Sequence, residues 1–137
     1  MKKIVYVSLE SLLAIHESMI DEYGGSHGIR DLTLLHSALA RAQASFNGEE
    51  LYPSIWEKAA ALFHSLLFNH GFIDGNKRTA ITTTTRFLAI NGCTLEVSSE
   101  EFVTFPLKME GERLSIEEIA KWLKIHNLAS NERASSG

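Results

Sequence analysis

Cysteine is almost absent from the sequence, and this excludes one way of stabilising a small domain. The 137 residues contain a single cysteine, Cys93, so no disulfide can form within the chain. Proteins that depend on disulfides belong to oxidising compartments, whereas a lone thiol is compatible with a reducing one. No basic residue flanks Cys93, and we therefore expect an unreactive thiol.

Long apolar runs are missing as well. A membrane-spanning helix needs about 20 consecutive apolar residues, and no stretch of this chain approaches that length. The N-terminus opens with two lysines and a short apolar run, as in a signal peptide, but no small-residue cleavage site follows. Three polar residues interrupt the run: Glu10, His16 and Glu17. We therefore expect a cytoplasmic protein that does not contact membranes.

An excess of positive charge is also lacking. Thirteen Lys and Arg against seventeen Asp and Glu give a formal charge of −4. Proteins that hold nucleic acid by its phosphates usually present a basic stripe, and none is visible here. The acidic balance argues against a helix-turn-helix DNA-binding domain in particular, so we expect no direct contact with nucleic acid.

The residues that are present predict one mainly α-helical domain, residues 1–128, followed by a disordered polar tail, residues 129–137. Hydrophobic residues make up 45% of the chain, which is enough for a core. Apolar positions recur at helical spacing in several segments, and a polar capping residue precedes most of them. We expect helices after Ser8, Asp31, Ser54, Ser98 and Ser115, and one more that begins near Asn76 or Lys77.

Several details of this helical pattern can be predicted. The helix after Ser54 has a broad apolar face and should be central. Thr82–Thr85 have poor helix propensity, which burial should override. Pro106 should kink its helix or end it early. Asn47–Gly48 is a turn signal, typical of a small hairpin or flap.

One short segment concentrates polar groups between two apolar helices: NHGFIDGNKRTA, residues 69–80. Gly75 permits a positive φ, so backbone N–H groups can converge on an anion, and the following helix adds its free amides and dipole. Lys77 and Arg78 in that first turn oppose the dipole unless an anion is bound. A phosphate chain is the natural candidate.

The same segment holds two further groups that phosphate chemistry requires. Asp74 would be repelled by phosphates unless a Mg²⁺ ion bridges them. His70 is expected at the end of the preceding helix on its packed side, where it could accept a proton from a hydroxyl. A base, a metal carboxylate and an anion cradle predict phosphoryl or nucleotidyl transfer. The spacing does not match the P-loop motif.

Each feature also has an ordinary interpretation. The loop could be a plain turn, His70 a structural hydrogen-bonding group, and the two cations a solvated face. A zinc hydrolase built on His64, His70 and Asp74 is disfavoured because six residues of helix leave the histidines about 120° apart. Arg41 and Arg86 could reach the cleft, although ordinary surface ion pairs are favoured. The remaining histidines are interpreted as surface or local structural residues: His16, His27, His36 and His126.

Residues 70–78 resemble the Fic motif, H-x-F-x-[DE]-[AG]-N-[GK]-R, and lysine at its eighth position is similar to the Doc (death-on-curing) branch. The likeness extends over about residues 5–128 and includes YGGSHGIRDLTLLHSALARAQ, residues 23–43. It implies a Fic/Doc-like bundle of about six helices with a short flap. The segment Asn47–Tyr52 resembles the flap in position, where a target peptide could add as a strand.

The resemblance also implies roles for the residues of the motif. His70 would be the general base, Asp74 would hold Mg²⁺, and Phe72 would anchor the loop in the core. The nucleotide phosphates would be bound by the remaining positions: Gly75, Asn76, Lys77 and Arg78. Gly71 departs from the family, where proline is common, and should loosen the loop slightly.

Lysine at position 77 favours one of two activities that the resemblance implies. Doc-type proteins carry lysine there and are kinases that transfer the ATP γ-phosphoryl group to a threonine of elongation factor Tu, whereas AMP-transferring Fic proteins carry glycine. The sequence thus favours a toxin that inhibits translation, with AMP transfer and a catalytically idle binding module as alternatives. No inhibitory [ST]-x-x-x-E-[GN] helix is found, so restraint is expected from a Phd-like antitoxin.

Overall fold

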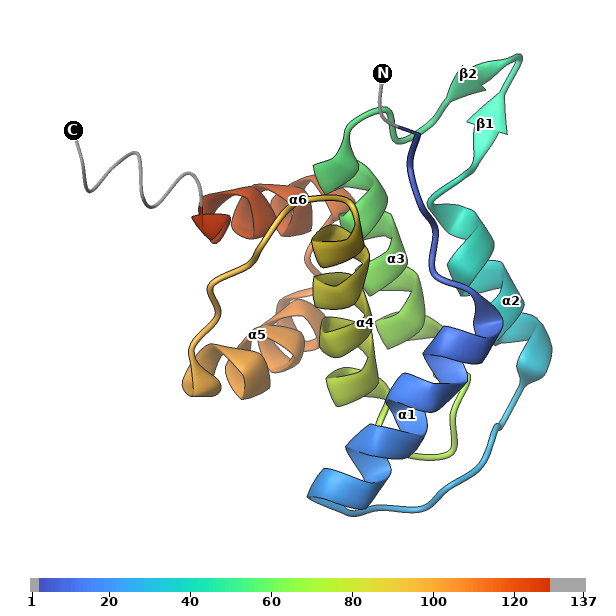
Figure 1. Ribbon diagram of the computed structural model, residues 1–137, viewed down its shortest axis with the longest axis vertical. Helices are drawn as coiled ribbons and strands as arrows, with labels where there is room; N and C mark the ends of the chain where they lie inside the picture. The colour runs from blue at the N-terminus through green and yellow to red at the C-terminus, as the bar shows by residue number, and fades with distance from the viewer. Residues whose placement is uncertain (1–2, 129–137) are drawn as a thin grey trace.

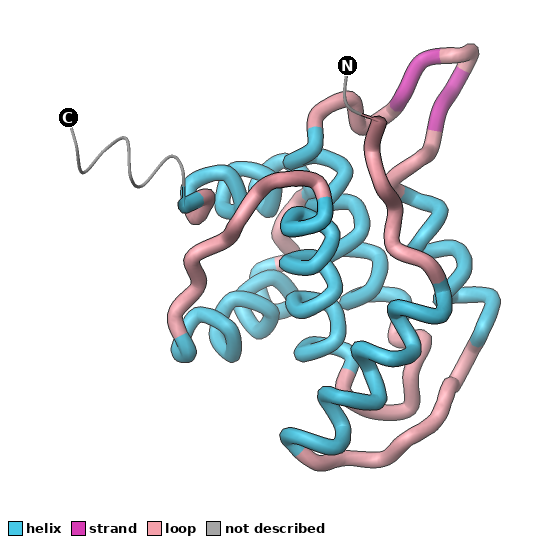
Figure 2. Tube along the Cα trace, in the orientation of Figure 1, coloured by secondary structure: helices cyan, strands magenta, loops and turns pink. Residues whose placement is uncertain are grey.

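The computed structural model describes residues 3–128, which form six helices and one two-stranded hairpin (Figures 1 and 2). The mainly helical fold expected from the sequence is confirmed, while the predicted disordered tail at 129–137 lies outside the described residues. No helix in this part of the chain combines the length and apolar character needed to cross a bilayer. The elements are α1 Leu9–Tyr23, α2 Leu32–Arg41, β1 Ser45–Phe46, β2 Glu49–Glu50, α3 Ile55–Asn69, α4 Asn76–Ile90, α5 Ser99–Glu112 and α6 Ile116–Ile125.

Five of the six helices begin at the caps that the sequence predicts. In each, the capping side chain accepts a hydrogen bond from a backbone N–H three residues later. The capping residues are Ser8, Asp31, Ser54, Ser98 and Ser115. Helix α4 is the exception, because its N-cap is Gly75, with φ 74° and no side chain to accept the first amides. The N-terminus of α4 therefore keeps its donors for another partner.

Helix α3 is central, as predicted. It packs against α2, α4, α5 and α6, and it passes through the middle of the molecule in Figure 1. Its small residues Ala59–Ala61 are completely buried, which lets neighbouring helices approach closely, and Phe63 fills the core beside them. Because α3 is fixed on most sides, the loop that follows its last residue starts from a rigid support.

The threonine run of α4 is helical because of burial, as the sequence predicts. Thr83 and Thr84 are fully buried, and the helix continues through them without interruption. The hydroxyls of Thr84 and Thr85 donate to the carbonyl oxygens four residues earlier, at 2.8 and 2.9 Å. Packing therefore outweighs the low helix propensity of threonine.

The prediction that Pro106 might end its helix early is wrong. Helix α5 continues six residues further, to Glu112. Pro106 is buried together with Phe105, whose ring stacks on Trp122 at 3.7 Å and meets Phe63 edge-on at 5.9 Å. Proline removes one helical hydrogen bond, and the burial of this apolar face offsets that loss.

The predicted hairpin is present, but it lies away from the polar loop. Asn47 and Gly48 form its turn at positive φ, and buried Lys58 ties it to α3 by donating to Glu50 Oε1 at 2.8 Å and to the Tyr52 carbonyl at 2.6 Å. The hairpin precedes the start of α3, whereas the polar loop follows its end, one helix length or about 22 Å away (Figure 1). The hairpin itself is confirmed, and the addition of a target peptide to it as a strand stays a prediction.

Helices α5 and α6 are joined by a side-chain hydrogen bond next to a capping box. His126 Nε2 lies 2.6 Å from Glu101 Oε2, and its Nδ1 donates to the Trp122 carbonyl at 2.8 Å. Glu101 also accepts from the Ser98 N–H at 3.1 Å. The Ser98 hydrogen bond first, and then the His126 ring, hold the pKa of Glu101 below its usual value.

Replacement of Glu101 should therefore destabilise the protein in a pH-dependent way. Folding lowers this pKa, so the stabilisation is present above the unfolded-state value of about 4.3 and is lost as the pH falls through the folded-state value. We expect Glu101→Gln to lower the melting temperature by a few degrees at pH 7, with a smaller difference below about pH 4. Glu100→Gln, an exposed neighbour in the same helical turn, is the control and should change little. Equal losses in both variants by thermal denaturation would contradict this account.

Candidate active site

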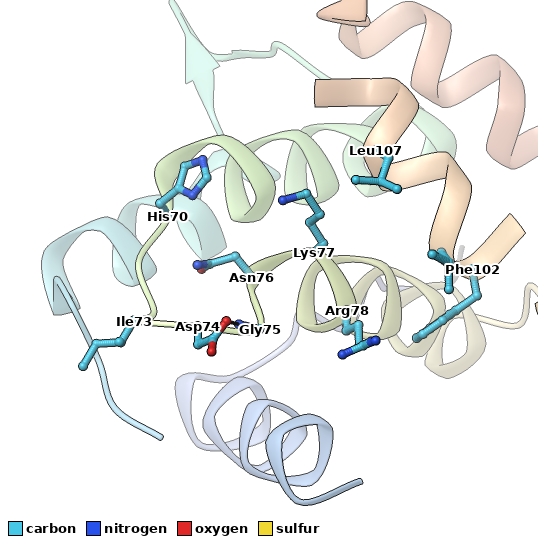
Figure 3. A pocket seen from close by; sticks show the side chains of 10 residues that line it. His70, Ile73, Asp74, Gly75, Asn76, Lys77, Arg78, Phe102 and Leu107 are labelled. Carbon is cyan, nitrogen blue, oxygen red and sulfur yellow. Dashed lines mark hydrogen bonds between the residues drawn. The ribbon is translucent and has the colours of Figure 1, made fainter. Parts of the chain in front are cut away.

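The loop between α3 and α4, the first turn of α4 and one face of α5 surround a pocket with a volume of about 390 Å³ (Figure 3). Its polar end comes from the loop and α4, and its apolar end comes from α5. All the site residues predicted from the sequence line it. The lining residues are His70, Ile73, Asp74, Gly75, Asn76, Lys77, Arg78, Phe102, Val103 and Leu107.

His70 ends α3 in the left-handed conformation, with φ 50° and ψ 50°. This turn carries its side chain away from the helix face, so the ring is 48% exposed and lines the pocket. The prediction that His70 lies on the packed side of the helix is wrong for this reason. An exposed imidazole at the mouth of a pocket is better placed to meet a substrate than a buried one.

Arg30 fixes the backbone of His70 from a distant part of the chain. Its Nε donates to the His70 carbonyl at 2.6 Å, and its Nη2 donates to the Asn69 carbonyl at 2.9 Å. A cation at the carboxyl end of α3 also complements the helix dipole. Sequence reasoning missed Arg30 because it lies 40 residues before His70 and no local pattern marks it.

The segment between α1 and α2 lies along the polar loop and holds its backbone. The N–H groups of Arg30 and Asp31 donate to the Gly71 carbonyl at 2.8 and 3.0 Å, and the Ile73 N–H donates to the Gly28 carbonyl at 3.1 Å. Ile29 and Phe72 form an isolated antiparallel bridge. This segment, rather than the hairpin, is the extended chain that lies beside the pocket.

A buried histidine supports the loop from below. Phe72 is 2% exposed and stacks on the ring of His16 at 3.7 Å, while Ile73 points outward, as expected if one of the two anchors the loop. His16 Nε2 donates to the Asp74 carbonyl at 2.8 Å. The interpretation of His16 as a surface or local residue is wrong, because its partners lie far along the chain, 58 residues away in the case of Asp74. Its position within the apolar stripe of α1 was the available signal.

The Asn76 side chain closes the loop on itself. Its Oδ1 accepts from the Phe72 N–H at 3.1 Å, and its Nδ2 donates to the Phe72 carbonyl at 3.0 Å. An amide group carries two N–H bonds, so a second one remains for a ligand. A phosphate-binding role for Asn76 stays a prediction, and positioning of the loop is what its contacts support directly.

Asp74 presents a carboxylate held by two backbone hydrogen bonds to the pocket. Its Oδ1 accepts from the Gly75 N–H at 3.0 Å, and its Oδ2 accepts from the Ser26 N–H at 3.1 Å, which orients an exposed carboxylate at the pocket. A Cβ on Gly25 would lie 2.8 Å from Oδ2, so the approach of this carboxylate requires glycine there. Mg²⁺ is commonly held by one or two carboxylates, water and substrate phosphates, so Asp74 fits that ion.

The zinc hydrolase alternative receives no support from the geometry. Within residues 3–128, no group of three or more His, Cys, Asp or Glu side chains could hold a metal ion. His64 contacts the ring of Phe68 at a tilt and does not line the pocket. Its pKa is lowered chiefly by burial and secondarily by the charge of Arg41.

The two cations of α4 line the pocket in different settings. Lys77 Nζ lies 3.3 Å from Glu110 Oε1 on α5, and the Arg78 guanidinium lies 4.5 Å from the centre of the Tyr23 ring. Both sit in the first turn of α4, which has no side-chain cap. Together with the free amides of that turn, they form a cationic end suited to phosphate.

The two other arginines considered from the sequence do not reach this pocket. Arg41 donates to the Tyr52 hydroxyl and to Ser65 Oγ, each at 3.2 Å, so its contacts are hydrogen bonds and not the expected surface ion pair. Arg86 lines separate hollows beside α4. The alternative that either holds the phosphates is therefore wrong.

Comparison with known proteins agrees with the motif. Residues 6–88 match the model of the Fic/DOC family, which is more than half of the chain. The chain belongs to the Fic/DOC family. The matched region includes the whole polar loop, the segment between α1 and α2 that holds it, and most of α4.

Two curated relatives refine the place of the chain within the Fic/DOC family. Toxin Doc of Mycolicibacterium smegmatis is 51% identical over 73 residues, which cover 53% of this chain and 56% of that protein. Protein kinase doc of Escherichia phage P1 is 29% identical over 119 residues, which cover 87% of this chain and 93% of that protein. The first alignment thus spans little more than half of the mycobacterial protein. Both names place the chain in the Doc branch, as the lysine at position 77 suggests.

The departure at Gly71 has a steric basis that can be tested. The residue is buried, and a Cβ there would lie 2.8 Å from Leu35 Cγ, so the glycine permits close packing of the loop on α2 and does not loosen it. We expect Gly71→Ala to lower the free energy of unfolding by about 1–3 kcal/mol in urea denaturation. Gly111→Ala, where the added Cβ would meet nothing within 4 Å apart from its chain neighbours and the backbone of its own helix, should be neutral or stabilising.

A double-mutant cycle identifies the source of the strain. In a Leu35→Ala background the clash is removed, so Gly71→Ala should cost clearly less than in the wild type. The same cost in both backgrounds would show that Leu35 is not the obstacle.

Proposed function

We propose that this protein is a Doc-type toxin: a Mg²⁺-dependent protein kinase that transfers the ATP γ-phosphoryl group to a threonine of a translation factor of the elongation factor Tu class, and so inhibits translation. The observation that carries the proposal is the arrangement of one pocket. An exposed histidine, an oriented carboxylate and an uncapped, doubly cationic helix start all line it.

The phosphate chain would be held by the start of α4. The N–H groups of its first turn lack a capping side chain and are available to an anion. Gly75, at φ 74°, starts this turn, and residues 75–78 line the pocket. Lys77 and Arg78 would contribute the charge that offsets the phosphates. Mg²⁺ held by Asp74 would neutralise charge that develops on the phosphates.

His70 would act on the acceptor hydroxyl. In the proposed step, His70 accepts the hydroxyl proton as the hydroxyl oxygen bonds to the γ-phosphorus, and the bond from that phosphorus to the bridging oxygen of ADP breaks. Arg30 keeps the His70 backbone in place through this step, because it holds both carbonyl oxygens at the end of α3. Positioning of this kind is the main contribution that a protein makes to phosphoryl transfer.

Transfer of AMP to a protein hydroxyl is the second candidate, because the same groups would serve an attack on the α-phosphate. Lys77 favours the kinase, since its side chain enters the pocket where glycine would leave space and no charge. The name of the phage P1 relative, a protein kinase, points the same way. A catalytically idle binding module is disfavoured because every residue of the motif that should react lines the pocket.

The biological setting follows from the same proposal. One relative is named a toxin, which supports a toxin–antitoxin system in which a Phd-like antitoxin restrains the protein. Its antitoxin and its translation target would be met in the cytoplasm.

Two labels distinguish the candidate reactions. Purified protein, Mg²⁺ and elongation factor Tu are incubated with ATP labelled at either the α- or the γ-phosphate. We expect label in the target from the γ-phosphate only. Label from the α-phosphate would establish AMP transfer instead, and no label over a range of hydroxyl-bearing targets would favour the idle module.

Replacement of the proposed base gives a second test. His70→Ala should abolish transfer, a loss of at least about a hundredfold, while the circular dichroism and melting temperature stay close to those of the wild type. His36→Ala, which removes another exposed histidine, is the matched control and should remain active. Persistent transfer by the His70→Ala variant would show that another group takes the proton.

A further inference from the structure

Helix α5 brings a carboxylate beside two residues that line the polar end of the pocket. Glu110 Oε1 lies 3.3 Å from Lys77 Nζ, and Glu110 Oε2 lies 3.7 Å from His70 Nε2. One acidic side chain thus contacts a group proposed to bind phosphate and the group proposed to accept the proton. In Figure 3, His70 and Lys77 lie on the same side of the loop, which is the geometry that allows a single carboxylate to reach both.

Both contacts of Glu110 are suited to being broken. Charge-assisted hydrogen bonds are typically shorter, about 2.7–2.9 Å, and partly exposed ion pairs contribute little to stability. The side chain of Glu110 is 36% exposed, so solvent screens it. Within residues 3–128 its carboxylate makes these two contacts and no hydrogen bond. Glu110 is therefore not locked in place.

From these contacts, and resting on the proposed function, we infer that Glu110 occupies the phosphate cradle when no nucleotide is bound and must leave Lys77 before a phosphate can bind. A carboxylate and a phosphate are both anions and would compete for the same ammonium group. They also repel each other at short distance. Nucleotide binding then exchanges one ion pair of Lys77 for another and releases the His70 ring at the same moment.

Arg78 shows that the competition is local. Its guanidinium lies over the Tyr23 ring, and no ion pair joins it to an acidic residue within the described part of the chain. An aromatic face does not exclude an anion from the edge of the guanidinium. Glu110 thus lowers the affinity for phosphate at Lys77, while Arg78 stays accessible to it.

Titration with inorganic tripolyphosphate tests this inference without requiring catalysis. By isothermal titration calorimetry, in the absence of Mg²⁺, Glu110→Gln should bind tripolyphosphate roughly fivefold or more tightly than the wild type. Glu112→Gln removes an exposed carboxylate from the same helix and should bind as the wild type does. In a Lys77→Ala background the gain from Glu110→Gln should disappear, because the group for which the two anions compete is absent.

The other outcomes separate this inference from the proposed function. Unchanged or weaker binding by Glu110→Gln, with the wild type binding normally, would overturn the inference alone. Weaker binding that occurs only when Mg²⁺ is added would also overturn it, since the carboxylate would then serve the metal. Failure of the wild type and the variant alike to bind millimolar tripolyphosphate would overturn both the cradle and the inference.

Discussion

The pocket depends on the backbone hydrogen bonds that join residues 28–31 to residues 71–73. The Gly71 carbonyl accepts hydrogen bonds from two N–H groups of residues 28–31, and the Ile73 N–H donates to the Gly28 carbonyl. These bonds determine where the chain leaves α3 and where it can enter α4. Without them the loop would have many conformations, because glycines at its positions 71 and 75 restrict the backbone little.

Side chains from the same region complete the support. Arg30 holds the last carbonyl oxygens of α3, and buried His16 holds the Asp74 carbonyl while its ring stacks on Phe72. Neither residue is proposed to react. Arg30 fixes the backbone of His70, the proposed base, and His16 fixes the backbone of Asp74, the proposed metal ligand. Groups with such fixed surroundings can meet a substrate with little loss of conformational freedom on binding.

Much of the fold could be predicted from the sequence, because its signals are local. Capping residues fix the starts of five helices. Helix α4 starts after Gly75, which has no side chain to cap its first amides. The effect of Pro106 was mispredicted because its neighbour Phe105 packs on Trp122 of α6, and this contact is not visible in the sequence around the proline. The hairpin was recognised by its turn, but its distance from the pocket depends on the direction of α3 in space.

The candidate site could be predicted only in part, for the same reason. Residues 70–78 are adjacent in sequence, so their motif reveals them together. His16, Arg30 and Glu110 reach the site from α1, from the loop before α2 and from α5, respectively, and no spacing rule links them to it. The signals that existed were weak: a histidine within an apolar stripe, and an acid one helix away from a group of cations.

The central claim is that the start of α4 binds the phosphates of a nucleotide beside His70. It is tested most directly by NMR, with ATP and Mg²⁺ titrated into ¹⁵N-labelled protein. The account predicts that the largest shifts fall on the backbone amides of residues 75–78 and on the ring of His70. Saturable binding that leaves these signals unchanged and perturbs another surface would contradict it.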